Sequence, residues 1–357
     1  MIQWRITSAV FGCLLLALLS GCTTTKKAAP QPYTFFPPEP DEPRIQYLTA
    51  FASEADLGRT RSFADYIIGE QKKADPLVKP YGLALHGDNI FVCDTVAGMI
   101  QVFDLKKNRA SYFSPQGEGK MRLPINISID RDGTRYVADT GREQVLIYNN
   151  AGVFLAALGK KDEMKPSDVA IATNRLYIAD LKHHCVRVLS KTDHQLLFTI
   201  PLDAKSADGK LFSPTNLAID EAGDRLLVSD TGGNVVQVYD LEGKYVRTIG
   251  RAGVAPGLFA RPKGVAVDRQ GLIYVVDAAT QVVQIFDATG RLLLVFGQAG
   301  ASTQGEVILP ASVKVDYDHT AFFQKYLAPG RQCDYLIFVT SQVGGQKVSV
   351  YGFLKPK

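Results

Sequence analysis

Short runs of alternating and apolar residues recur along the chain, and residues 262–297 show the pattern most clearly. This stretch, PKGVAVDRQGLIYVVDAATQVVQIFDATGRLLLVFG, contains four such runs, at 264–268, 272–277, 281–287 and 291–296. Turn sequences with Asp and Gly separate the runs, and β-branched or aromatic runs bounded in this way are typical of short antiparallel strands. The pattern predicts a four-stranded sheet, which needs packed copies of itself to bury both faces.

Further copies of this unit are present. Each begins with a proline, and the prolines follow one another at intervals of 42 to 48 residues: Pro80, Pro124, Pro166, Pro214, Pro262 and Pro310. Six four-stranded units of this period predict an all-β fold, a six-bladed β-propeller, in which radial repetition leaves only short sheet edges.

An aspartate closes the second run of the first five units, and Thr340 aligns with it in the sixth. The five are Asp94, Asp139, Asp180, Asp230 and Asp277. One carboxylate at one repeat position suits a local structural task. We therefore expect each to accept hydrogen bonds from the N–H groups of the turn that follows, rather than to act in catalysis.

These motifs resemble the NHL repeat family. An opening proline, a first strand such as Gly-Val-Ala-Val-Asp, a second strand that ends in Asp, a third such as Val-Gln-Val-Tyr-Asp and a closing Phe-Gly match closely in units one, two, four and five. The resemblance covers residues 44–353 and implies a propeller whose first strand in each blade is innermost. It indicates little about activity, because propellers host many unrelated functions.

The sixth unit supplies only three strands and ends at 347–353. Residues 44–51, RIQYLTAF, read as a strand without a neighbour in sequence. We expect this strand to complete the last blade, because pairing would close the ring and remove an open edge. The propeller domain is therefore predicted to span 44–357, with 52–79 leading to the first unit through a short helix near 63–68.

Residues 1–21 are predicted to be a lipoprotein signal peptide. Arg5 precedes an apolar run at 10–19 that is too short for a transmembrane helix, and Leu19-Ser-Gly-Cys22 follows. The resemblance to lipoprotein signals implies cleavage before Cys22 and acylation of that residue; the alternative is a plain signal and an ordinary cysteine. Thr23 replaces the Asp of the usual inner-membrane retention signal, which favours the bacterial outer membrane, at its periplasmic face or the cell surface.

Residues 22–43 are predicted to be a tether. Six prolines occur between 23 and 43, and Pro-rich segments are extended and semi-rigid. The propeller would then contact the membrane through the lipid anchor only. The aromatic sequence at 33–36 either docks on a protein surface or enters the lipid interface, and the sequence favours neither.

Charge and cysteine content narrow the function classes. The formal net charge is +4, so basic and acidic residues nearly balance and give no support for nucleic-acid binding. Beyond the leader and Cys22, three cysteines remain, Cys93, Cys185 and Cys333, and an odd number is not a disulfide framework. Cys93 lies in a predicted strand and is expected to be a small buried residue.

Three polar residues two positions after an opening proline form a candidate metal site. Asn126, Asp168 and Asn216 come from three consecutive units and would ring one mouth of the channel. Carboxylate and amide oxygens suit Ca²⁺. Lactonase-type propellers hold calcium in a comparable place but use a Glu that is missing here. The alternative is a solvated polar channel mouth.

A candidate ligand-binding rim surrounds the same mouth. It comprises Lys120, Arg122, His183, His184, Arg251 and Arg261. Neutral imidazoles near a carboxylate bind zinc or act as a general base, and lyase-type propellers use several histidines. The histidines here, however, do not recur at one repeat position. Acidic residues nearby also partly neutralise the positive charge of the rim. Solvated loop residues are the alternative.

Residues 317–335 interrupt the sixth unit between its first two strands. The insertion should project from the face opposite that mouth, with Phe322, Phe323 and Tyr326 at helical spacing. These aromatic residues either pack back onto the blade or form an exposed patch.

The sequence contains no nucleophile elbow, P-loop or dinucleotide motif and yields no catalytic residue. It favours a binding or scaffold protein whose partner is an envelope protein assembly or a glycan. The alternative is a metal-dependent enzyme of the lactonase or lyase kind, with Ca²⁺ at Asp168.

Overall fold

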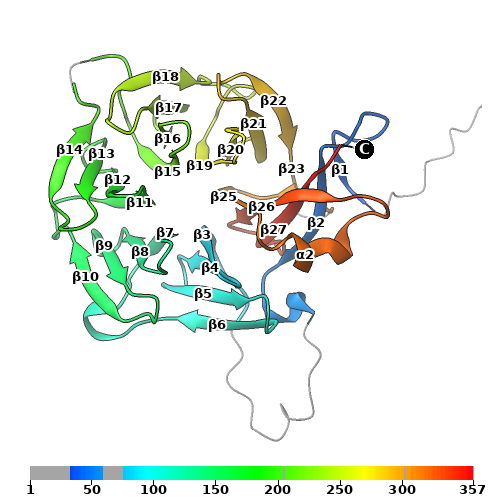
Figure 1. Ribbon diagram of the computed structural model, residues 1–357, viewed down its shortest axis with the longest axis horizontal. Coiled ribbons are helices and arrows are strands. Elements are labelled where there is room, and N and C mark those ends of the chain that lie inside the picture. The colour runs from blue at the N-terminus through cyan, green and yellow to red at the C-terminus, as the bar shows by residue number, and fades with distance from the viewer. Residues whose placement is uncertain (1–32, 59–74, 204–205, 301–302, 357) are drawn as a thin grey trace, which may run out of the picture. The chain divides into compact units, whose positions relative to one another are not determined.

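The computed structural model describes residues 33–58, 75–203, 206–300 and 303–356, and these form a six-bladed β-propeller (Figure 1). The prediction of an all-β propeller with four-stranded antiparallel blades is confirmed. The predicted signal peptide, Cys22 and the helix near 63–68 lie outside the described residues.

Each of the first five blades contains four consecutive antiparallel strands. Blade one contains β3 (Pro80–His86), β4 (Asn89–Asp94), β5 (Met99–Asp104) and β6 (Arg109–Phe113). Blade two contains β7 (Pro124–Ile129), β8 (Arg135–Asp139), β9 (Gln144–Tyr148) and β10 (Phe154–Leu158). Blade three contains β11 (Pro166–Ile171), β12 (Arg175–Asp180), β13 (Cys185–Ser190) and β14 (Leu196–Ile200). Blade four contains β15 (Pro214–Asp220), β16 (Arg225–Asp230), β17 (Val235–Tyr239) and β18 (Tyr245–Ile249). Blade five contains β19 (Pro262–Val267), β20 (Ile273–Asp277), β21 (Val282–Phe286) and β22 (Leu292–Phe296).

The sixth blade joins the two ends of the propeller. It contains β25 (Pro310–Asp316), β26 (Cys333–Ser341) and β27 (Val348–Leu354), followed by β2 (Ile45–Phe51) from the N-terminal side. Ile45 pairs with Phe353 and Phe51 with Val348, so the predicted closure is confirmed. The pairing removes the open edge that β27 would otherwise present.

A short strand from the predicted tether adds to this blade. β1 (Phe35–Phe36) pairs with β2, and the Phe36 ring packs against Phe296 and Tyr351 with centroid distances of 6.2 and 6.3 Å. The aromatic sequence at 33–36 therefore docks on the propeller itself, at the junction of blades five and six.

The hydrophobic core is divided among the interfaces between blades. At one interface Cys93 and Ile100 of blade one pack with Val137 and Leu146 of blade two. At the closing interface Phe51 and Phe338 of blade six pack with Phe103 of blade one. Cys93 is fully buried, as expected, and because each blade packs only on its neighbours, one chain supports this large domain.

The buried aspartates hold the interblade connections. Asp277 accepts hydrogen bonds from the N–H groups of Ala279 and Thr280 in the following turn, as predicted. It also accepts hydrogen bonds from Ala260 and Arg261, which precede the opening proline. This second role was not predicted. It means that the aspartate links the connection before the blade to the turn after the second strand, on one face of the propeller.

The alignment of Thr340 with these aspartates was wrong by one residue. In the first five blades the aspartate lies opposite the opening proline, and Ser341 lies opposite Pro310. The Ser341 hydroxyl accepts a hydrogen bond from Ile308 N at 3.3 Å. Thr340 instead donates to the Tyr81 carbonyl of blade one, at 2.6 Å, and so joins the closing interface.

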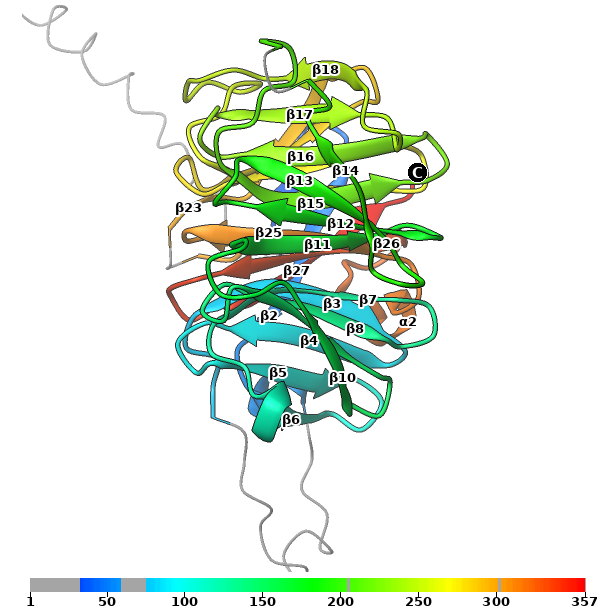
Figure 2. The same ribbon diagram turned by 90° about the vertical axis from the view of Figure 1, so that its left-hand side faces the viewer.

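The connections before the opening prolines and the turns after the second strands form what we call the loop face. The opposite face, here the hairpin face, carries the turns between first and second strands and the insertion at 317–335. Figure 2 shows β23 (Gln298–Ala299), which pairs with β24 (Glu306–Val307), and the insertion helix α2 (Thr320–Phe323) on opposite sides of the disc.

The insertion packs back onto blade six. Phe323 is 1% exposed and contacts Phe338 at a centroid distance of 5.7 Å, whereas Phe322 and Tyr326 are partly buried beside it. Three short 3₁₀ helices complete the described structure: Glu54–Leu57, Gly117–Gly119 and Gln324–Tyr326. Among the described helices, none has the length and apolar character needed to cross a bilayer.

Candidate functional site

The innermost strands β3, β7, β11, β15, β19 and β25 surround the central channel, as the repeat resemblance implied (Figure 1). Residues at two repeat positions on these strands determine which side chains are buried between the blades and which line the channel. The second residue after each opening proline is buried between blades wherever it carries a polar side chain. The fourth residue after each proline lines a cavity that opens on the hairpin face.

The three candidate calcium ligands lie at the second position and are nearly buried. Asn126, Asp168 and Asn216 are 4, 5 and 3% exposed, so they do not form a solvated channel mouth. Asn126 Nδ2 donates to the Ser167 carbonyl of the next blade at 2.7 Å. The Asp168 carboxylate accepts from Val169 N in its own blade and from Leu217 N in the next, each at 2.9 Å. These hydrogen bonds join consecutive blades.

The electrostatic surroundings of Asp168 disfavour a cation site. Burial raises the pKa of the Asp168 carboxyl to about 6, while Lys314 and the two N–H donors act in the opposite direction. Ca²⁺ takes six to eight oxygen ligands, and here the lone carboxylate already accepts two N–H groups and lies within the field of a lysine. Asn216 Oδ1 is buried without a hydrogen-bond partner among the described residues. These side chains fit an interblade contact better than a calcium site.

The histidines of the candidate rim lie in the turn after β12. His183 Nδ1 is 2.8 Å from Asp180 Oδ2, which also accepts from Arg187 Nε at 2.9 Å. Burial raises the pKa of Asp180, but hydrogen bonds from Lys165 N, Arg187 and His183 outweigh it and lower the pKa. His184 is exposed, with a φ of 53°. Throughout the part of the chain that the structure describes, no three His, Cys, Asp or Glu side chains converge on a metal position.

The basic rim residues are exposed on the loop face. Lys120 and Arg122 precede blade two, and Arg251 and Arg261 precede blade five. None of their side chains forms a hydrogen bond or ion pair with a described residue. The acids of the blade-three connection have local partners: Asp162 lies 3.7 Å from Lys182, and Glu163 lies 4.0 Å from Arg187. The rim therefore keeps four cationic groups available.

The loop face also exposes large apolar side chains, which the sequence reading missed. They lie in the connections and turns of four blades: Val78 (51% exposed), Val96 (64%), Leu202 (58%), Phe212 (52%), Val254 (78%), Leu309 (38%) and Val343 (39%). Four of them come from blades one and six, which are neighbours across the closing interface. The sequence did contain a signal for this surface, because these large apolar residues occur in segments that were predicted to be loops.

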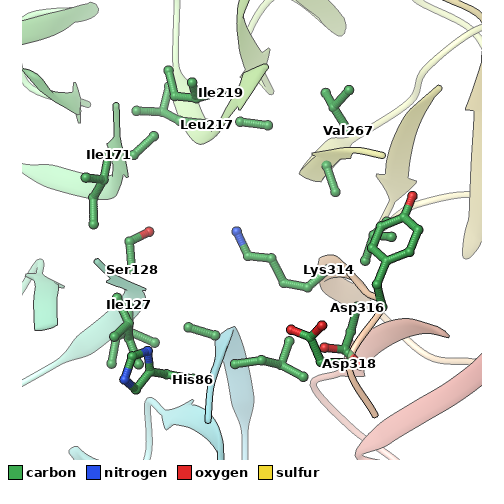
Figure 3. Close-up of a pocket in the computed structure, with 18 of the residues that line it drawn as sticks. His86, Ile127, Ser128, Ile171, Leu217, Ile219, Val267, Lys314, Asp316 and Asp318 are labelled. Atoms are coloured by element: carbon green, nitrogen blue, oxygen red, sulfur yellow. The ribbon is translucent and has the colours of Figure 1, made fainter. Parts of the chain in front are cut away.

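The sequence reading also missed a cavity on the hairpin face. It has a volume of about 440 Å³ and is lined by the inner ends of all six blades and by the start of the insertion (Figure 3). Five blades place a small residue at the fourth repeat position, and the sixth places a lysine: Ala84, Ser128, Ala170, Ala218, Ala266 and Lys314. The small residues leave room for the cavity. A comparison of this position across the six units would have shown that the lysine is the exception.

Comparisons with known proteins agree with the fold. Residues 164–189 match the NHL repeat, and residues 199–352 match a family described as a 6-bladed beta-propeller. Among curated proteins, Protein brain tumor of Drosophila melanogaster is 28% identical over 138 residues, a match that covers 38% of this chain and 12% of that protein. The chain thus spans about an eighth of the length of that relative.

Solved structures resemble the chain over most of its length. A structural genomics protein from Bacteroides thetaiotaomicron has a TM-score of 0.61 at 16% identity, covering 86% of this chain and 75% of that one. A gluconolactonase from Xanthomonas campestris has a TM-score of 0.57 at 14% identity, covering 87 and 89%. A streptogramin B lyase has a TM-score of 0.53 at 14% identity, covering 80 and 86%. At such identities the likeness shows the fold alone.

Proposed function

We propose that this NHL-repeat propeller is a binding and scaffold protein of the bacterial envelope, anchored by lipid at Cys22, whose loop face recognises another protein. The sequence Leu19-Ser-Gly-Cys22 supports the anchor. An outer-membrane location, at the periplasmic face or the cell surface, follows from Thr23 in place of the retention aspartate.

The observation that carries the binding proposal is the composition of the loop face. Val96, Phe212 and Val254 are at least half exposed. Exposed cations that form no hydrogen bond or ion pair with a described residue, including Arg122 and Arg261, surround the same channel end. Apolar anchors with arginines around them are typical of protein interfaces. The exposed arginines favour a partner with acidic groups. A glycan is less well supported, because Phe212 is the one aromatic side chain among the seven large apolar residues exposed there.

The alternative is an enzyme that uses Asp168. Against it, both oxygens of the Asp168 carboxylate accept backbone N–H groups, and the side chain is nearly buried. The lyase and the lactonase among the structural relatives share the fold at identities too low to transfer an activity.

Photo-crosslinking in cells tests the proposal. A photoreactive residue at Val96, Phe212 or Val254 should yield a discrete crosslinked protein, and Arg261→Glu should weaken the crosslink. The matched controls are Leu155, Leu197 and Val246, which are 43 to 56% exposed on the outer strands and should yield none. Equal crosslinking from both sets, or none from the loop face, would contradict a binding role for that face.

A further inference from the structure

The sixth blade departs from the other five at one point inside the channel. Four blades have alanine and one has serine at the fourth position after the opening proline, where the sixth has Lys314. A long charged side chain at this position is not required by the repeat, because β25 keeps the same pairing with β26 that the other first strands have with their neighbours. The requirements of the fold therefore do not explain the lysine at this position.

The Lys314 ammonium is not bound by any side chain of the described structure, although its charge acts on the buried Asp168 carboxyl. No described residue forms a hydrogen bond or ion pair with it. Asp316 is occupied by His319, whose Nδ1 lies 3.0 Å from Asp316 Oδ1 and whose backbone N–H donates to Asp316 Oδ2. Figure 3 shows Lys314 extended towards the middle of the cavity and towards Ser128, away from Asp316 and Asp318. The ammonium is thus presented to whatever fills the cavity.

The walls around this cation are mixed in character. Charged and polar side chains line the part of the cavity formed by blades one, five and six, namely His86, Arg269, Asp316, Asp318 and His319. Ile171, Ile219 and Val267 form an aliphatic part of the wall on blades three, four and five. Ser128 adds one hydroxyl, which already donates to the Val169 carbonyl at 2.6 Å. Small-molecule sites typically have volumes of about 300–1,000 Å³, and a cavity of about 440 Å³ falls in this range.

We infer that this cavity binds a small organic acid, whose carboxylate pairs with Lys314 and whose aliphatic or aromatic body lies against the apolar wall. A single ammonium matches a monoanion. A phosphate dianion would leave one charge unpaired near Asp316 and Asp318, and desolvating an unpaired charge is costly. The site lies on the face opposite the proposed protein-binding surface and does not depend on that proposal.

Calorimetric titration of the purified full chain with phenylacetate, with phenylacetamide and with inorganic phosphate tests the inference. Phenylacetate should bind, and the neutral amide of the same shape should bind at least tenfold more weakly, because it lacks the charge that Lys314 recognises. This comparison uses the unchanged protein and does not depend on the folding of any variant.

Variants then assign the binding to Lys314. Lys314→Met keeps the length of the side chain without its charge, and Lys314→Ala restores the residue of the other blades; each should weaken phenylacetate binding at least tenfold. Lys244→Met, the same charge change at an exposed turn, should leave it unchanged. Failure of phenylacetate to bind, or equal binding by Lys314→Met, would overturn the inference. Binding of phosphate in preference to phenylacetate would overturn the assigned ligand class.

Discussion

Ser341 lies directly opposite Pro310 across β25 and β26, in the place that an aspartate holds in the other five blades. Both residues accept hydrogen bonds from backbone N–H groups, but they accept different numbers of them. Asp277 accepts hydrogen bonds from four backbone N–H groups, whereas Ser341 accepts one, from Ile308.

This difference predicts unequal costs of substitution. Asp277→Ala leaves several N–H groups without a partner beside a buried site and should destabilise the fold by about 3 kcal/mol or more, whereas Ser341→Ala should cost about 1 kcal/mol. Thermal and urea denaturation followed by circular dichroism measures both. Asp287→Ala, in an exposed turn of the same blade as Asp277, is the control and should have a smaller effect than Asp277→Ala. Equal losses in all three would contradict the assigned role.

The closure predicts a graded response to shortening the N-terminal side. Removal of residues 1–32 should leave the melting temperature of the propeller nearly unchanged. Removal through residue 43 deletes β1 and the Phe36 contacts and should lower it by a few degrees. Removal through residue 51 deletes β2 and should cause aggregation, because the β27 edge and the apolar flank of blade six are then exposed. If the third truncation were as stable as the first, the ring would not depend on β2.

The proposed lipid anchor predicts the behaviour of one substitution. Cys22→Ser should release the protein from the membrane fraction or leave an unprocessed precursor, since the acylated sulfur is absent. Fractionation with labelling by a palmitate analogue measures this, and Cys93→Ser serves as the matched cysteine control. Processed Cys22→Ser protein that still sediments wholly with membranes would refute lipid anchoring.

The raised pKa of Asp168 predicts a pH dependence. The carboxyl has a pKa of about 6 when folded and about 4 when unfolded, so folding favours its neutral form. Its contribution to stability is fully present below about pH 4 and is lost as the pH rises through about 6. Asp168→Asn should therefore flatten the decline in the melting temperature between pH 4 and 7. A variant whose pH profile parallels the original would argue against this pKa.

Chelation tests whether Asn126, Asp168 and Asn216 bind calcium. A bound ion stabilises the native state by mass action, so its removal would lower the melting temperature. We expect EGTA to change it little, because the Asp168 oxygens already accept N–H groups. A large decrease that Asp168→Asn abolishes would favour the metal-dependent enzyme instead.

The fold could be predicted from the sequence because marker residues recur at the same positions of most repeats. Each opening proline and each closing aspartate recur, which defined the six units. The three-strand sixth unit indicated the closing role of 44–51, whereas the innermost position of the first strands came from the resemblance to the NHL repeat. The misplacement of Thr340 has the same origin: blade six lacks the aspartate and carries an insertion, so no marker fixed the alignment there, and only the pairing of Pro310 with Ser341 resolves it.

The sites were harder to predict because exposure is a property of the assembled ring. Asn126 and Asp168 are polar residues beside a channel, and a linear reading could not indicate that adjacent first strands approach closely enough to bury them. A Cβ added at Gly82 would lie 2.2 Å from Asn126 Oδ1, which shows how close that approach is. Conversely, Lys314 resembled an ordinary strand lysine until the equivalent alanines were compared.

The pairing of β2 with β27 has a consequence for the order of events during synthesis. Among the described strands, β2 is the second to be synthesised and its partner β27 is the last, with the strands of the other five blades made in between. Blades one to five can assemble from local hairpins, but the sixth must wait for both termini, and contacts of such large sequence separation form slowly. We therefore expect folding to pass through a stage in which five blades are complete and the facing edges of β2 and β27 are still unpaired. Unpaired strand edges can pair with other chains, so we expect this stage to be the most prone to aggregation.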